Sequence, residues 1–549
     1  MMKDIIGREE VSHLQQKGGK NIRYSNKGYL LILSAILLFA FFIRFYRLDF
    51  NDMYNDTAIV CKRGILFFQG YWWQIIIERD GPLYLLMHGL SNIIFGVGEV
   101  SSRLPSVVAG VLLCALTYEF GKRLFNEKVG LISAAVVAVS TPCTIISRVA
   151  GPGMMVDFFI VLAIYGFYRY ITEEKFLWGI IFSFALTLGV ITKISAFISI
   201  PICLALGWIY DRKLSFFKNK EFLVLTIPFW IIAYPYMFLL IAQTFLARTA
   251  LTGSVISDTL GGGVFCFGIP FYIKVIYEYF SPIVFLLVVA VLILMIYKRK
   301  IEKAEQVCIV WLLIPFLFYA LVIEKAKPFY IVPSFYPIAI LCGNLIASLM
   351  MGRDKGKEER RKGRKVLVLI VLVCLLSGNS FYTYNTIFKE DGFRVPYDTY
   401  GSYNRHGLDA LGWYMHRYSY PEDIIISAGY LDSSVEFYTN RLFITPSQEH
   451  SNLSLIMMEL FNLPKVNYSN LRYAIATKVI EQPKEKAYIE EVKEKHPLVA
   501  IIRVSGKDSI YIYDLKAEKK DIIERPMIIN TEDVEKEYKN TGEFFPVWW

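Results

Sequence analysis

The sequence predicts an α-helical polytopic membrane protein, a bundle of about 11 transmembrane helices followed by a C-terminal extracytoplasmic α/β domain. Three observations predict this fold class. The 549 residues are 55% hydrophobic and only 20% charged, and the mean hydropathy is +0.41, which is more apolar than a soluble globular chain. The apolar residues form continuous runs, which excludes a porin-like barrel of short alternating strands. The chain beyond residue 381 is polar and mixes short strand-like and helix-like runs.

The first apolar run is Gly28–Ile43, which follows a basic tail of residues 1–27. Arg44 and Arg47 follow this run without a small-residue cleavage site, so we expect an uncleaved first span rather than a signal peptide. Ten further runs are long and apolar enough to cross a bilayer. They are Leu104–Phe120, Val129–Ile146, Met154–Tyr168, Phe176–Ile191, Ile194–Tyr210, Phe222–Ala242, Pro282–Tyr297, Val307–Ile323, Phe329–Met350 and Val366–Ser380.

The run Pro82–Phe95 is apolar but would reach only about 20 Å as a helix, so we expect it to lie at the interface. Cytoplasmic loops carry excess Lys and Arg. If the N-terminus is cytoplasmic and Pro82–Phe95 is not a span, every strongly basic loop falls on the cytoplasmic side; these loops are 122–128, 212–220, 298–303 and 353–365. The sequence therefore predicts a multi-pass protein of the plasma (inner) membrane, with a cytoplasmic N-terminus and a long first external loop, residues 47–103.

The net charge of +10 is explained by these loops. Basic residues beside membrane spans set the orientation and contact anionic lipid. The charge therefore does not indicate a nucleic-acid partner.

Three parts of the chain follow: a cytoplasmic tail (1–27), a membrane module (28–381) and an external domain (382–549). In the external domain, strand-like runs at Asp423–Ala428, Tyr473–Thr477, Val499–Val504 and Ser509–Leu515 alternate with helical runs, which is typical of a small α/β domain. No nucleotide-binding glycine signature follows any of these strands.

Cysteine and histidine patterns indicate neither a disulfide framework nor a metal site. The eight Cys and six His are dispersed, without metal-ligand spacing. Only Cys61 and Cys266 fall in external loops, and we expect two free thiols there. The sequence implies no cofactor and leaves a requirement for a divalent metal open.

Ionisable residues gather on the predicted external side. The group contains Asp49, Asp52, Asp56, Glu78, Arg79, Asp80, Glu99, Arg103, Arg148, Asp157, Lys193, Arg248, Asp258, Glu324, Lys325 and Lys327. Sugar transfer from a lipid phosphate needs a carboxylate to accept the nucleophile's proton and cations to hold the leaving phosphate. Solvated loop charges are the alternative for each residue taken singly.

Short motifs in order resemble the opening of glycosyltransferase family 39. They are Asp56-Thr57-Ala58, Asp80-Gly81-Pro82-Leu83-Tyr84, Phe95-Gly96 with Glu99, Arg103-Leu104-Pro105-Ser106, Lys122-Arg123-Leu124-Phe125, Ser147-Arg148, Thr192-Lys193 and Tyr330-Ile331-Val332-Pro333. This family includes the dolichyl-phosphate-mannose protein mannosyltransferases and the bacterial lipid A aminoarabinose transferase. The resemblance covers most of residues 28–350 and is closest to bacterial-type members.

The resemblance implies a GT-C fold and a polyprenyl-phosphate-linked sugar donor, with undecaprenyl phosphate as the carrier in a bacterium. It implies inverting transfer to a cell-envelope acceptor, which is a glycan, lipid or protein hydroxyl. Asp56 matches the catalytic base, and Asp80 and Asp157 are further catalytic candidates. The candidates for binding the donor phosphate are Arg79, Arg148, Lys193, Arg248, Lys325, Lys327 and Tyr330.

The sequence departs from the family pattern at two acidic positions. Thr57 stands where the family has glutamate after the aspartate, and Gly153 stands where a second aspartate is usual. Asp157 lies one helical turn after Gly153, on a similar face. Two other classes therefore remain open: a lipid or solute transporter, and a non-catalytic envelope scaffold derived from the enzyme family. The absence of an internal repeat and the surface position of the charges disfavour the transporter.

Overall fold

The protein is described from a computed structural model. The structure describes residues 22–49, 55–72, 81–238, 240, 269–279, 285–286, 288–291, 293, 301–322, 328–351, 358–388, 407–428, 438–439, 443–444, 468–477, 483–518 and 525–541.

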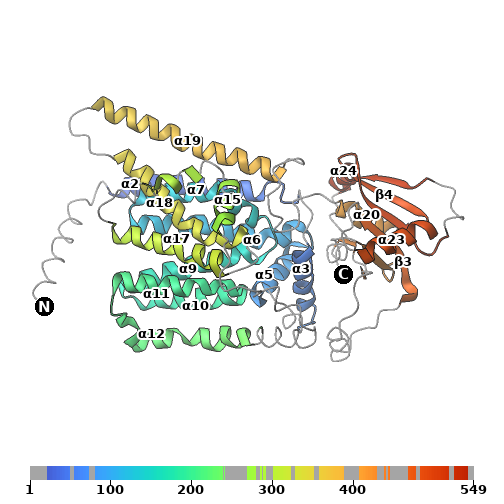
Figure 1. Ribbon diagram of the computed structural model, residues 1–549, viewed down its shortest axis with the longest axis horizontal. Coiled ribbons are helices and arrows are strands. Elements are labelled where there is room, and N and C mark those ends of the chain that lie inside the picture. The colour runs from blue at the N-terminus through green and yellow to red at the C-terminus, as the bar shows by residue number, and fades with distance from the viewer. Residues whose placement is uncertain are drawn as a thin grey trace, which may run out of the picture.

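A helical bundle and a smaller sheet domain make up the molecule, with the sheet domain at one end of the bundle (Figure 1). Two short helices of the first external loop, α3 (Asn55–Phe68) and α5 (Pro82–Phe95), lie at the bundle end that faces the sheet domain. The two helices pack closely where glycine lacks a side chain, since a Cβ added at Gly64 would lie only 2.8 Å from the Cα of Gly89. The expected short helix at Pro82–Phe95 is present with the expected bounds, whereas α3 was not expected.

The described residues contain six helices long and apolar enough to cross a bilayer, or seven if a bent pair counts as one span. These helices are α2 (Ile22–Phe45), α6 (Glu99–Leu124), α9 (Pro152–Glu173), the run Lys220–Phe238 with α12 (Lys220–Leu225) and the π-helical η3 (Phe229–Ala233), α17 (Lys303–Val322), and the run Phe329–Met350 with η4 (Pro328–Ser334) and α18 (Phe335–Met351). Shorter or separate elements are α10 (Phe176–Thr192), η1 (Ile194–Ile198), α11 (Ser199–Tyr210), η2 (Ser215–Lys218), α15 (Ile269–Tyr279) and α19 (Glu358–Phe388).

The predicted number of about 11 spans is therefore not confirmed. The predicted span Phe176–Ile191 forms a helix of 17 residues, which reaches only about 26 Å. Most of the predicted span Pro282–Tyr297 lies outside the described residues. The predicted span Val366–Ser380 lies within α19, a helix of 31 residues.

The predicted span Val129–Ile146 is two helices, α7 (Glu127–Ala138) and α8 (Thr141–Ser147), which meet at 61°. A break inside an apolar bundle frees carbonyl groups that no water satisfies. The Arg44 guanidinium at the end of α2 donates to the carbonyl groups of Val137 (3.2 Å) and Ala138 (2.9 Å). The Thr383 hydroxyl of α19 donates to the carbonyl of Val139 (3.3 Å). Three consecutive carbonyl groups at the break thus have donors.

The C-terminal domain is built on a mixed six-stranded sheet of order β2-β1-β3-β5-β4-β6. The strands are β1 (Ile424–Ala428), β2 (Phe443–Ile444), β3 (Leu471–Thr477), β4 (Leu498–Val504), β5 (Lys507–Asp514) and β6 (Met527–Asn530), and the helices are α20 (Leu408–Tyr418), α23 (Pro483–Lys495) and α24 (Thr531–Thr541). β5 pairs antiparallel with β3 and β4, and the other pairings are parallel. The expected α/β domain and its four expected strands are confirmed.

Strand β3 shows how this sheet builds two cores. Tyr473 and Ile475 join the apolar cluster that includes α20 and α24, whereas Ala474 and Ala476 join the cluster with α23. Alternate side chains of a strand point to opposite faces, so the sheet is covered by helices on both faces. This arrangement explains why β3 reads as a continuous apolar run rather than an alternating one.

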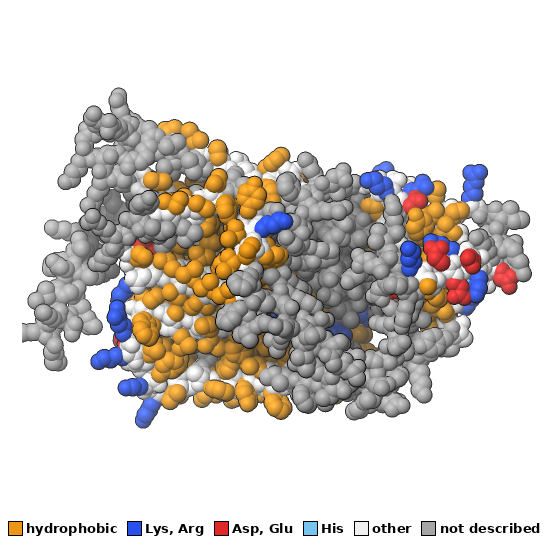
Figure 2. All heavy atoms as spheres, viewed as in Figure 1, with side chains coloured by type: hydrophobic (Ala, Val, Ile, Leu, Met, Phe, Trp, Pro, Cys, Tyr) orange, Lys and Arg blue, Asp and Glu red, His pale blue; other side chains and the backbone are white. Residues whose placement is uncertain are grey.

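The surface of the bundle differs between its two ends and its sides. In the view of Figure 2, apolar side chains cover the described part of the bundle, and Lys and Arg side chains gather at the end away from the sheet domain. The sheet domain carries side chains of both charges. This distribution is what the charge pattern of the loops predicts for a cytoplasmic end and an extracytoplasmic end.

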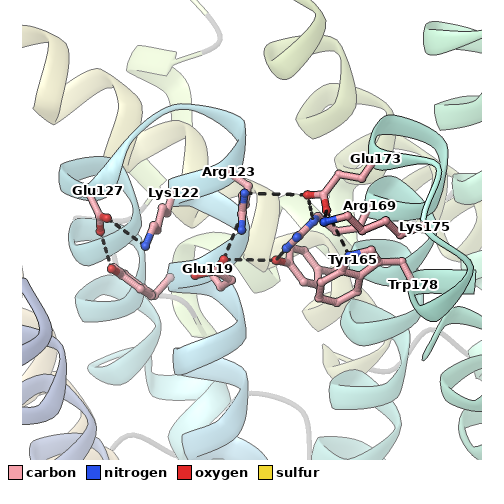
Figure 3. A network of polar contacts seen from close by, with 10 residues as sticks. Glu119, Lys122, Arg123, Glu127, Tyr165, Arg169, Glu173, Lys175 and Trp178 are labelled. Carbon is pink, nitrogen blue, oxygen red and sulfur yellow. Dashed lines mark hydrogen bonds and ion pairs between the residues drawn. The ribbon is translucent and has the colours of Figure 1, made fainter. Parts of the chain in front are cut away.

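A network of paired charges ties three helices together at the end of α6 (Figure 3). Arg123 of α6 bonds Glu119 (3.1 Å) and reaches Glu173 of α9 (3.8 Å). Glu173 also forms an ion pair with Arg169 and accepts a hydrogen bond from the indole of Trp178 on α10 (3.2 Å). Every charge named here has an opposite partner, so this network fixes helix ends rather than presenting a free binding site.

Candidate functional site

The helix that carries Asp56 lies at the end of the bundle covered by the sheet domain. Asp56 is in the first turn of α3, and the structure does not describe its side chain. Other candidates lie outside the described residues, namely Arg79, Asp80, Arg248, Lys325 and Lys327. Asp157, Arg148, Lys193 and Tyr330 are described.

Asp157 and Lys193 come from neighbouring helices and act on one another electrostatically. Asp157 lies in the second turn of α9, is 4% exposed, and accepts a hydrogen bond from the hydroxyl of Tyr336 (3.3 Å) on α18. Lys193 is the C-cap residue of α10, which ends at Thr192, and its ammonium group interacts electrostatically with the Asp157 carboxyl group. Asp157 and Gly153 lie on the same helix one turn apart, as the sequence predicted.

Aromatic rings lie close to Lys193 and Asp157. The ammonium nitrogen of Lys193 lies 5.5 Å from the centre of the Phe329 ring, within cation–π range. The next residue, Tyr330, stacks on Tyr319 of α17 with ring centres 5.0 Å apart. Three of the predicted residues, Asp157, Lys193 and Tyr330, are thus brought to one region by α9, α10 and η4.

The backbone beside Asp80 reaches the same region. Gly81 has φ +117°, a conformation that other residues rarely adopt, and a Cβ there would lie 2.4 Å from the carbonyl oxygen of Thr192. Glycine therefore lets the start of α5 lie against the end of α10, directly before Lys193. This contact places residue 81, and hence the chain next to Asp80, beside Lys193.

Arg148 is placed differently from Lys193. Its guanidinium donates to the carbonyl groups of Arg44 (3.0 Å), Tyr46 (2.7 Å) and Arg47 (2.6 Å), at and beyond the end of α2. It also lies 5.1 Å from the centre of the Phe388 ring. A cation at a helix C-terminus satisfies the unpaired carbonyls and the helix dipole. These contacts describe a cap for α2, and a role of Arg148 in phosphate binding stays a prediction.

Several motif residues of the first external loop and of α6 donate hydrogen bonds to backbone carbonyl groups. The hydroxyl of Tyr84 donates to the carbonyl of Ala150 (3.0 Å), and Ser106 donates to that of Gly151 (3.2 Å). Arg103 donates to the carbonyl of Leu48. The motifs therefore hold the turn that starts α9, the helix of Asp157.

Helix α3 contains a further cation that was not among the sequence candidates. The pKa of Lys62 is lowered to about 8, chiefly because burial penalises the charged ammonium group and secondly because Arg63 is adjacent. Perturbed lysines of this kind concentrate at functional sites. The signal in the sequence was a Lys-Arg pair in an otherwise apolar stretch, six residues after Asp56.

Cys61 of the same helix is a free, buried thiol, and burial raises its pKa to about 12. Cys266 lies outside the described residues. Among the residues that the structure describes, no three His, Cys, Asp or Glu side chains group as a metal site would require.

The family resemblance is supported by sequence comparison. Residues 79–238 match the family model for dolichyl-phosphate-mannose-protein mannosyltransferase. An uncharacterized protein of Aquifex aeolicus is 26% identical over 344 residues, which are 60% of this chain and 66% of that protein. The putative mannosyltransferase YkcB of Bacillus subtilis is 25% identical over 180 residues, 31% of this chain but only 25% of that protein. The chain thus spans less than two thirds of each relative.

The fold is decided by a solved structure. The crystal structure of ArnT from Cupriavidus metallidurans bound to undecaprenyl phosphate superposes with a TM-score of 0.60 at 13% identity, covering 89% of this chain and 98% of that one. The chain has the GT-C fold. The family match over residues 79–238 agrees with the resemblance to family 39. In this GT-C bundle, Asp157, Lys193 and the aromatic rings lie at the end that faces the sheet domain.

Proposed function

We propose that this protein transfers a sugar from a polyprenyl-phosphate-sugar donor to a hydroxyl group of an extracytoplasmic acceptor. The family match over residues 79–238 supports a lipid-phosphate sugar donor. The structural neighbour holds undecaprenyl phosphate, which supports that carrier here. The acceptor is a cell-envelope glycan, lipid or protein.

The reaction is a single displacement that inverts the anomeric carbon. The acceptor oxygen forms a bond to C1 of the sugar while the bond from C1 to the phosphate oxygen breaks. The acceptor proton passes to the carboxylate of Asp56, and the polyprenyl phosphate leaves with the electron pair of the broken bond. Cations near the phosphate stabilise the charge that develops on it.

The observation that carries this proposal is the fixed cation at Lys193. The Phe329 ring centre lies 5.5 Å from its ammonium nitrogen, and the Asp157 carboxyl group, which accepts a hydrogen bond from Tyr336, interacts with it electrostatically from α9. A cation held in place can meet a leaving phosphate without first being ordered. Lys325 and Lys327 directly precede η4, which carries Phe329, and we assign them with Arg79 and Arg248 to the same phosphate.

A small apolar pocket is lined by residues of α17 and α18. Ser334 of η4 donates to the carbonyl of Leu312 (3.1 Å), and the pocket begins at that residue. It is lined by Val288, Val291, Ile309, Leu312, Leu313, Ile338 and Leu341. A lining without polar atoms is compatible with contact to an apolar part of a membrane lipid.

We infer that the site faces the extracytoplasmic side of the inner membrane, with the N-terminus in the cytoplasm. The position of Lys and Arg at the opposite end of the bundle supports this orientation (Figure 2).

Lipid analysis of cells tests the proposal. Cells that carry the Asp56→Asn variant should accumulate the lipid-linked sugar that wild-type cells consume, because the acceptor is no longer deprotonated. Asp49→Asn is the matched control, since Asp49 is an exposed aspartate of the same loop. Equal lipid-linked sugar in wild-type and Asp56→Asn cells would contradict the role of Asp56.

A further inference from the structure

A hydrogen bond joins the sheet domain to the start of α6. The hydroxyl of Tyr438 donates to the Oε1 atom of Glu99, the first residue of α6, across 339 positions of sequence. Tyr438 is 2% exposed, and the Glu99 side chain is 11% exposed. A hydroxyl that donates to a carboxylate is a charge-assisted hydrogen bond, which is stronger and more directional than a neutral one.

The contact continues from Glu99 to the segment before α3. Glu99 pairs with Arg103 one turn along α6 (3.8 Å). The Arg103 guanidinium is buried and donates to the carbonyl of Leu48. Leu48 lies seven residues before Asn55, where α3 begins. Three successive polar contacts therefore link the sheet domain to the segment that leads to Asp56.

A second and independent contact holds α3 itself. Ala58 and Cys61, on the first two turns of α3, belong to the same buried apolar cluster as Leu408, Leu411 and Met415 of α20. The side of α3 that meets the sheet domain thus begins two residues after Asp56. The close packing of α3 on α5 leaves this helix between α5 and the sheet domain (Figure 1).

We propose that Tyr438 is a positioning residue, which holds the Asp56 helix in place through Glu99 and Arg103. The expected effect of Tyr438 on sugar transfer rests on the proposed function, because Asp56 is the base in the proposed reaction. Its effect on the order of residues 49–61 does not. The sheet domain then serves as one wall of the site and sets the position of its carboxylate.

The test compares Tyr438→Phe with Tyr473→Phe in the full-length protein in detergent. Both tyrosines are buried in the sheet domain, but the Tyr473 hydroxyl donates to the carbonyl of Tyr418 (2.7 Å) inside that domain. Hydrogen exchange is followed in peptides that cover residues 49–61 and in peptides of β3 and β4. We expect Tyr438→Phe to accelerate hydrogen exchange in residues 49–61 and to leave exchange in β3 and β4 unchanged. We expect Tyr473→Phe to leave exchange in residues 49–61 unchanged.

Transfer kinetics supply the second readout. Tyr438→Phe should lower kcat roughly tenfold to a hundredfold with little change in the donor KM, because misplacing a reacting group affects the chemical step. In a Glu99→Gln background, adding Tyr438→Phe should lower kcat little further than Glu99→Gln alone does, since the two residues act in one chain of contacts.

The outcomes separate the two proposals. Faster exchange at residues 49–61 in a protein with no transfer activity supports the positioning contact and contradicts the proposed function. Unchanged exchange and unchanged kcat in Tyr438→Phe would overturn the positioning role. Equal losses in Tyr438→Phe and Tyr473→Phe would also overturn it, because they would show a general effect on the stability of the sheet domain.

Discussion

Asp157 places a carboxyl group inside an apolar bundle, where an ionisable side chain is costly and is kept only with partners. Its partners are the Tyr336 hydroxyl and the positive charge of Lys193. We expect Tyr336→Phe to raise the donor KM about fivefold, because the loss of one hydrogen bond of about 1 kcal/mol leaves Asp157 less well placed beside Lys193. Steady-state transfer assays with varied donor concentration measure this change.

Tyr319→Phe is the control for this prediction. Tyr319 is 4% exposed, lies near Asp157 and stacks on Tyr330, but none of the hydrogen bonds to Asp157 among the described residues comes from it. It should leave the donor KM within about twofold of wild type. A similar rise in both variants would show that packing, rather than the bond to Asp157, sets donor affinity.

His88 of α5 gives the external loop a dependence on pH. Burial lowers the pKa of His88 to about 4, against about 6.5 in the unfolded chain, and its Nδ1 donates to the carbonyl of Ser102. Between pH 4 and pH 6.5 the unfolded chain therefore binds more protons at His88 than the folded protein does. The free energy of unfolding is therefore highest above pH 6.5, and it falls by up to about 3 kcal/mol as the pH drops toward 4.

Thermal unfolding of the protein in detergent between pH 4.5 and 7.5 measures this loss. His88→Gln keeps a side-chain donor for Ser102 and removes the titrating group, so its melting temperature should depend less on pH over this range. An unchanged slope in the variant would assign the acid sensitivity to other groups.

At the scale of the elements, buried arginines hold helix ends that the sequence shows only as flanking charge. Arg44 donates to the carbonyls that end α7 and to the Ser147 hydroxyl of α8 (3.2 Å). Gly110 of α6 leaves room for this arrangement, because a Cβ there would lie 2.2 Å from the Ser147 Oγ atom and 3.0 Å from the Arg44 Nε atom. We expect Gly110→Ala to destabilise the bundle by about 1–3 kcal/mol through overpacking.

Gly28→Ala in α2 is the matched control, since no atom lies within 4 Å of a Cβ added at Gly28. This change should be neutral or slightly stabilising, because alanine favours the helix over glycine. Thermal unfolding in the same detergent gives the melting temperatures of both variants and so tests this difference. Equal melting temperatures for the two variants would contradict the close contact at Gly110.

The elements also show which part of the fold could be predicted from the sequence. Continuous apolar runs located the long helices and strands β1, β3, β4 and β5, because burial dictates their composition. The break between α7 and α8 was missed because its residues are as apolar as the helices. Pro142 in the first turn of α8 was the available signal.

The site could be predicted only in part, for a physical reason that Arg148 illustrates. The motifs that resemble family 39 identified Asp157, Lys193 and Tyr330, which the fold brings to one region. The sequence could not distinguish a cation held for a ligand from one that caps a helix, since both are arginines or lysines at helix ends. Tyr336 was missed because its role depends on contact with Asp157 across 179 residues.

At the scale of the whole molecule, the two ends of the bundle have different chemistry. One end carries the paired charges around Glu173 (Figure 3) and the basic surface of Figure 2. The other end carries α3, α5 and the sheet domain (Figure 1). Helix α6 begins at Glu99 beside Tyr438 and runs 26 residues to Leu124, roughly 39 Å. That length spans a hydrocarbon core of about 30 Å, so the two ends belong to opposite sides of the membrane.

Labelling of introduced thiols tests which end faces the cytoplasm. Lys507, the first residue of β5, and Lys213, in the loop after α11, are both exposed lysines. In intact cells, a membrane-impermeant maleimide should label Lys507→Cys, because the excess of Lys and Arg at the far end of the bundle places the sheet domain outside. Lys213→Cys should be labelled only after lysis. Labelling of Lys213→Cys alone in intact cells would show the reverse orientation. The Lys193 region would then face the cytoplasm, and the protein would have to use its polyprenyl-phosphate donor there.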